Sequence, residues 1–195
     1  MTAPSRDLEG NARVPDLKKD HRGLRRRPLY TPLAIVIASV LAVVLAGAWL
    51  VSSWGSTTIV LVRHAEKLPD GEDPGLSEAG LAHAETLAEM LQHAGLAAIY
   101  VSEARRTRET ATPVAAATGI APRVIPAETR SSLLRRLKWR HRGEVVLVVA
   151  HSNTAPAIAE GLGAPIGIVE ADDYAGLWII TYSRLRGTRL LKLRY

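Results

Sequence analysis

The chain has 195 residues, a formal net charge of +6, and neither cysteine nor phenylalanine. The lack of cysteine excludes disulfide bonds but does not identify a compartment, because many exported bacterial domains lack them. The basic charge is concentrated in residues 1–32, which carry eight Lys or Arg and four Asp or Glu. Because this charge lies mostly at one end of the chain, it is poor evidence for nucleic-acid binding, and we expect no nucleic-acid partner.

Residues 1–32 are rich in proline, glycine and charge and show no apolar periodicity, which predicts a disordered basic tail that can lie against anionic headgroups. Residues 33–51 carry no charge, and as a helix they would reach about 28 Å, enough to cross a bilayer. The positive-inside rule then puts the N-terminus in the cytoplasm and the later residues outside the cell membrane. We predict an uncleaved single-pass anchor. Ala46-Gly47-Ala48 has the form of a signal-peptidase site, so a cleaved signal is one alternative and a buried helix of a soluble domain is another.

A linker at residues 52–56 leads to a domain at 57–195, which has the length of a domain with one hydrophobic core. Apolar runs and helical spacing predict alternating elements in this domain. In chain order they are a strand at Thr58–Val62, a helix from an N-cap at Ser77 to about His93, a strand at Ala98–Val101, a helix at Arg106–Thr118, a strand at Arg123–Ile125, a helix at Ser131–Arg142, a strand at Val145–Ala150, a helix from about Asn153 to Leu162, and closing strands at Leu177–Tyr182 and Leu190–Tyr195 around a turn at Gly187. This order predicts an α/β fold: a three-layer α/β/α sandwich with a largely parallel central sheet.

Polar residues directly follow two of the apolar strands. Arg63 and His64 come after the first strand, and His151 comes after Val145–Ala150. Since the carboxyl ends of strands line the ligand crevice in open α/β sheets, we expect these side chains at one edge. A neutral histidine nitrogen can attack a phosphoryl group, and the planar fork of arginine binds two phosphate oxygens. A further arginine, from residues 102–111, opens a helix whose N-terminus favours an anion. The arrangement predicts phosphoryl chemistry.

Three motifs in this order resemble the histidine phosphatase superfamily, also called phosphoglycerate mutase-like. They are Leu61–Glu66 with its Arg-His pair, Ser102–Ala111 with the spacing Ser-x-x-x-Arg-x-x-x-Thr-Ala, and Val148–Asn153 with the second histidine. The alanine after the Arg-His pair replaces the usual glycine, as in small bacterial members that this chain resembles. The resemblance implies a nucleophile at His64, which becomes a phosphohistidine. It also implies that Arg63, Arg106 and His151 bind the phosphoryl group, without a metal ion or cofactor.

Two further residues receive roles through the same resemblance. Lys67 falls where acid-phosphatase members have a third phosphate-binding arginine, so it is a candidate phosphate ligand. Those members take their general acid from the residue after the second histidine, which here is Ser152 and is unsuited to the role. Mutase-like members instead use a glutamate after the second motif, which makes Glu128 the candidate acid, with a surface loop carboxylate as the alternative. Residues 172–174 either line the pocket or only form a loop.

We therefore predict a phosphatase domain that is exported and anchored in the cell membrane. The domain has little room for a capping insertion, so we expect an open pocket that admits a phosphorylated small molecule, a phosphorylated protein or a lipid head group. Two other classes stay open. One is a non-catalytic module that binds phosphate or phosphoproteins, and the other is a membrane scaffold whose basic tail is the working part.

Overall fold

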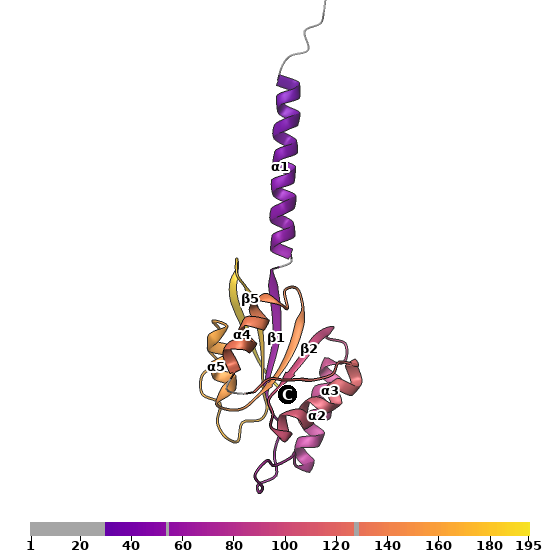
Figure 1. Ribbon diagram of the computed structural model, residues 1–195, viewed down its shortest axis with the longest axis vertical. Helices are drawn as coiled ribbons and strands as arrows, with labels where there is room; N and C mark the ends of the chain where they lie inside the picture. Colours follow the sequence, from indigo (N-terminus) through magenta and orange to yellow (C-terminus); the bar gives the residue numbers. More distant parts are fainter. Residues whose placement is uncertain (1–29, 54, 127–128) are drawn as a thin grey trace, which may run out of the picture. The chain divides into compact units, whose positions relative to one another are not determined.

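The structure of the protein, a computed structural model, describes residues 30–53, 55–126 and 129–195 (Figure 1). The predicted tail, apart from its last three residues, and the candidate acid Glu128 therefore lie outside the described residues. Helix α1 spans Tyr30–Ser53, and within it Pro32–Leu50 is long and apolar enough to cross a membrane. A secretory signal near the N-terminus has the same length and composition, so the helix alone does not separate an anchor from a signal.

Six strands form one sheet in the order β3-β2-β4-β1-β5-β6. Their bounds are Ser56–Arg63 for β1, Leu96–Val101 for β2, Arg123–Val124 for β3, Val145–Ala150 for β4, Gly176–Ser183 for β5 and Gly187–Arg194 for β6. Strands β3, β2, β4 and β1 pair in parallel, whereas β5 is antiparallel to both β1 and β6. The prediction of a largely parallel sheet is therefore wrong, and the sheet is mixed.

The direction of β5 has a clear cause in the connections on either side of it. The loop before β5 delivers Leu177 beside Val62 at the carboxyl end of β1, so β5 must run back along its neighbour. Residues 184–186 then join β5 to β6, and so short a connection can link only antiparallel strands. The turn consequently lies just before Gly187, which is the first residue of β6 rather than the centre of the turn.

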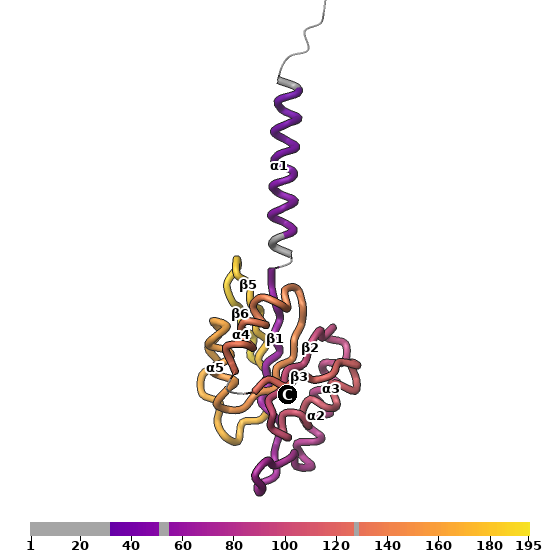
Figure 2. The backbone as a smooth tube through the Cα atoms, viewed as in Figure 1, coloured from indigo at the N-terminus to yellow at the C-terminus, as the bar shows by residue number. Residues whose placement is uncertain are grey.

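Two pairs of helices cover the two faces of the sheet (Figures 1 and 2). Helices α2 (Glu78–Leu91) and α3 (Arg105–Thr118) bury Leu87 and Val114 against one face. Helices α4 (Arg130–Trp139) and α5 (Thr154–Gly161) bury Leu137 and Ile158 against the other. The helices of each pair present apolar stripes at helical spacing, so each face of the sheet has its own buried cluster. The result is an α/β domain in three layers.

Helix α2 fixes the loop that leaves β1. Ser77 is its N-cap, as predicted, and accepts a hydrogen bond from the amide of Gly80 at 3.1 Å. A Cβ atom on Gly80 would overlap the carbonyl oxygen of Glu66, so only glycine lets the helix approach this closely. The amide of Ser77 donates to the same carbonyl oxygen at 2.9 Å. These contacts hold the segment that begins at His64.

Candidate active site

His64 follows the last residue of β1 and is 3% exposed. Its Nδ1 lies 2.8 Å from the carbonyl oxygen of Ala65, and because a carbonyl oxygen only accepts, Nδ1 carries the proton and Nε2 keeps a lone pair. The pKa of His64 is lowered to about 4, chiefly because burial disfavours the charged ring. The hydrogen bond to Ala65 raises this pKa by a smaller amount, and the positive charge of Arg63 lowers it. The ring is therefore neutral at pH 7, with Nε2 available as a nucleophile.

Arg63 is held by the loop that precedes β5. Its Nη1 donates to the carbonyl oxygen of Glu170 at 2.8 Å and to that of Asp173 at 3.2 Å, and its guanidinium carbon lies 4.0 Å from the ring centre of Tyr174. Among the described residues nothing pairs with its buried Nε. Buried donors are costly to leave unpaired, so an anion bound here would be stabilised. Residues 170–174 thus orient an arginine of the site, a role that the sequence did not predict.

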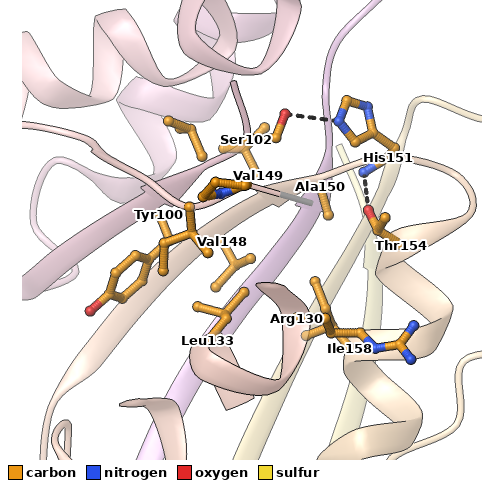
Figure 3. Close-up of a pocket in the computed structure, with 13 residues that line it drawn as sticks. Tyr100, Ser102, Arg130, Leu133, Val148, Val149, Ala150, His151, Thr154 and Ile158 are labelled. Atoms are coloured by element: carbon orange, nitrogen blue, oxygen red, sulfur yellow. Dashed lines mark hydrogen bonds between the residues drawn. The ribbon is translucent and has the colours of Figure 1, made fainter. Parts of the chain in front are cut away.

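The second histidine and the middle motif meet where β4 and β2 end. His151 Nε2 lies 2.8 Å from Ser102 Oγ (Figure 3), and His151 Nδ1 lies 3.5 Å from Arg106 Nη2. Because arginine only donates, Nδ1 is the acceptor and the proton sits on Nε2. Burial lowers the pKa of His151, as does the charge of Arg106, so this ring is also neutral at pH 7. The rings of His151 and His64 lie 5.4 Å apart, edge to face.

Helix α3 is tied to the loop after β1 by Thr110. The amide of Ala65 donates to Thr110 Oγ1 at 3.0 Å, and this hydroxyl donates to the carbonyl oxygen of Arg106 at 2.7 Å. The first amide of α3 has a carboxylate partner from the loop that follows β1. Both carboxylate oxygens of Asp73 accept from the amide of Arg105 at 3.0 Å, and one lies 3.6 Å from Arg106 Nη1.

One open pocket of about 430 Å³ joins these side chains. It is lined by Arg63, His64, Lys67, Arg106, His151, Ser152, Asn153 and Thr154. The structure thus brings together all the candidate site residues except Glu128, which is outside the described residues. Lys67 lies at the exposed rim, where Nζ is 3.4 Å from the carbonyl oxygen of Leu68. The described lining contains several cations and no carboxylate, which suits an anionic group.

A second cavity, of about 30 Å³, lies beside His151 (Figure 3). Its walls are mostly apolar and include Tyr100, Leu133 and Ile158. Thr154 belongs to both cavities, and its hydroxyl accepts a hydrogen bond from the amide of His151 at 2.9 Å. The apolar wall lowers the local dielectric around the imidazole, which agrees with the lowered pKa of His151.

Comparison with known families agrees with this geometry. Residues 59–129, which include Arg63, His64 and Arg106, match the profile of the histidine phosphatase superfamily (branch 1). The chain is thus similar to the histidine phosphatase superfamily over this segment. Among curated proteins, no sequence matches this chain significantly.

Solved structures share the fold of this domain. A protein from Agrobacterium tumefaciens assigned as the phosphohistidine phosphatase SixA is 25% identical, with coverage of 71% of this chain and 98% of that chain and a TM-score of 0.53. A mycobacterial glucosyl-3-phosphoglycerate phosphatase is 18% identical, with coverage of 72% and 98% and a TM-score of 0.57. A protein histidine phosphatase SixA complexed with tungstate is 15% identical, with coverage of 70% and 96% and a TM-score of 0.58. At the two lower identities, the likeness concerns the fold alone.

Proposed function

We propose that this chain is a phosphatase that forms a phosphohistidine at His64. The observation that carries this proposal is the hydrogen bond between His64 Nδ1 and the carbonyl oxygen of Ala65, which leaves Nε2 unprotonated in a pocket lined by cations. Nε2 attacks phosphorus while the bond to the leaving group breaks, and the leaving group takes up a proton. Water then attacks the phosphohistidine, which releases inorganic phosphate and restores the neutral imidazole.

The pocket cations are suited to the charge that spreads over the phosphoryl oxygens during transfer. We assign phosphoryl binding to Arg63, Arg106 and His151, with Lys67 as a further ligand from the rim. Arg63 is oriented by its bonds to main-chain carbonyl oxygens, and Arg106 by its contact with His151 Nδ1. Their buried Nε atoms, unpaired within the described parts of the chain, are donors that an anionic substrate would satisfy.

The preferred substrate depends on how the leaving group obtains its proton. The described pocket lining has no carboxylate, and we propose Glu128 as the general acid for alcohol leaving groups. A departing imidazole is a much weaker base than an alkoxide, so it depends less on such an acid. We therefore infer that a phosphorylated histidine side chain fits this pocket best, with phosphomonoesters as the second class. The fold shared with proteins named as phosphohistidine phosphatases supports this choice.

The location of the activity is part of the same proposal. We propose a basic cytoplasmic tail at residues 1–32, a membrane anchor at 33–51, a linker at 52–56 and a phosphatase domain at 57–195 outside the membrane. The length and apolarity of Pro32–Leu50 support the anchor. Reporter fusions placed after Val51 test the orientation, because an exported reporter must be active and a cytoplasmic reporter inactive.

Phosphate release by the full chain in detergent micelles tests the chemistry. Substrates are a phosphohistidine peptide and a panel of phosphomonoesters, and the variants are His64→Ala and His93→Ala. His93 is an exposed histidine beyond the end of α2, so its variant controls for loss of an imidazole. We expect turnover and an acid-labile phosphoenzyme in the parent and in His93→Ala, and neither in His64→Ala.

One alternative function is favoured by a specific observation, namely the absence of a carboxylate from the described pocket lining. A module that only binds phosphate needs no general acid. Such a protein would bind vanadate or phosphate in the same samples and yet release no phosphate from any substrate.

A further inference from the structure

Two segments with distant sequence positions form a basic and aromatic face on the domain. They are residues 138–142, which end α4 and begin the following loop, and residues 184–186, which join β5 to β6. The exposed ring of Trp139 contacts two guanidinium groups: its centre lies 5.3 Å from the guanidinium carbon of Arg142 and 4.1 Å from that of Arg184. Trp139 is 52% exposed and Leu185 is 69% exposed. Apolar tips surrounded by cations are typical of residues at a membrane–water interface.

The charge of this face has one sign. The two segments contain five Lys or Arg and no Asp or Glu. The carboxylate of Glu144, just after the first segment, accepts a hydrogen bond from His141 Nδ1 at 2.6 Å. Within the described parts of the chain, none of the five cations forms an ion pair with a carboxylate, so they can attract an anionic surface. Trp139 and Leu185 add exposed apolar area to the same segments.

The position of the face favours a bilayer as its partner. The amide of Gly143 donates to the carbonyl oxygen of Ser56 at 2.8 Å, and Ser56 pairs with Ser183 across the β1–β5 ladder. Both segments of the face therefore adjoin residues that contact Ser56, the first residue of β1. In the sequence, only residues 54 and 55 separate Ser56 from the last residue of the apolar helix. If the helix is held in a membrane, a tether of that length keeps Ser56 within about 11 Å of the helix end.

We infer that residues 138–142 and 184–186 bind the surface of an anionic lipid bilayer, with Trp139 and Leu185 at the headgroup level. This inference rests on the proposed membrane anchor. It also narrows the substrate class. Strand β1 has eight residues from Ser56 to Arg63, so the catalytic pocket lies about 23 Å from the bound face, at the other end of the strand. The pocket is then presented to soluble phosphorylated proteins or small molecules rather than to headgroups of the same bilayer.

The absence of cysteine from the chain permits a direct test, because one introduced cysteine takes the only thiol label. We would place a fluorophore at Leu185→Cys on the inferred face, or at Glu72→Cys, an exposed position in the loop between β1 and α2. The full chain is reconstituted into vesicles of phosphatidylcholine alone or mixed with phosphatidylglycerol. A trace lipid with a nitroxide on its headgroup quenches fluorophores that lie at the surface. Flotation with the vesicles verifies insertion of the chain.

In the mixed vesicles we expect strong quenching at residue 185 and little at residue 72. Added salt should reduce the quenching of the label at residue 185 when all five cations of the face are present, because screening weakens their attraction to phosphatidylglycerol. The double variant Arg142→Gln, Arg184→Gln should reduce it to the level of the residue 72 label, whereas the control Arg108→Gln, on α3, should not. Equal quenching at both positions, equal quenching in both vesicle types, or failure of the chain to float would overturn the inference. None of these readouts depends on turnover, so the proposed phosphatase activity is tested separately.

Discussion

Protonation of His64 makes the stability of the domain depend on pH. Its pKa is about 4 in the folded protein, compared with about 6.5 in an unfolded chain. As the pH falls, the unfolded chain binds the proton first, so this stabilisation is complete above about pH 6.5 and is lost as the pH approaches 4. The difference between the two pKa values corresponds to about 3 kcal/mol of unfolding free energy, of which about 2 kcal/mol is lost by pH 5.

The substitution His64→Asn isolates this contribution because asparagine is polar and does not titrate. We would measure urea unfolding of the full chain in detergent micelles at about pH 7.5 and about pH 5. The parent should lose about 2 kcal/mol more unfolding free energy between these conditions than the variant. His151, whose pKa is also lowered, is present in both proteins and cancels in the subtraction. Equal losses in parent and variant would refute the reasoning.

Catalysis should follow the same protonation. The proposed nucleophile must be neutral, so kcat/KM for a substrate that does not itself titrate in this range should persist well below pH 6.5 and decline as the pH nears about 4. An apparent pKa near 6.5 on the acidic side of the profile would instead mean that His64 is solvated as an ordinary histidine.

Three further substitutions test individual contacts. Arg106→Lys keeps the charge but loses the fork, so kcat/KM for phosphate release should fall about 100-fold, whereas Arg108→Lys on the exposed side of α3 should have little effect. Tyr174→Leu removes the ring that packs on Arg63, and kcat/KM should fall about 3- to 30-fold with recovery in Tyr174→Phe; equal losses in both variants would contradict a role for the ring face. Ser77→Ala removes the N-cap of α2, so the unfolding free energy measured in urea titrations should fall by about 1 kcal/mol. An unchanged unfolding free energy would mean that the hydrogen bond to the amide of Gly80 does not stabilise the helix.

Much of the fold could be predicted because local pattern and burial agree in this chain. The apolar runs at Ile59–Val62 and Val145–Ala150 are buried strands, and the helical spacing after Ser77 is a helix with that residue as its cap. Strand direction then predicts that Arg63, His64 and His151 come together, since residues that follow parallel neighbours leave the sheet at the same edge. That part of the site depends only on periodicity and order along the chain.

Other features depend on contacts between distant segments, which no local pattern encodes. The reversed direction of β5 arises from the loop that delivers it to the carboxyl end of β1, so the sheet is mixed although every strand in it was expected. Asp73 occupies the start of α3 because a loop 32 residues earlier folds over it.

By itself, the sequence determined the strands, the helices and the order in which the two histidines and the arginines reach one edge, because these follow from side-chain periodicity. Only the tertiary structure decided how the site is tuned. The carbonyl oxygens of Glu170 and Asp173 orient Arg63 from more than a hundred residues away, and burial by the packed domain keeps His64 neutral. Both effects come from groups that meet only when the chain is folded, so the composition of the motif could not reveal them.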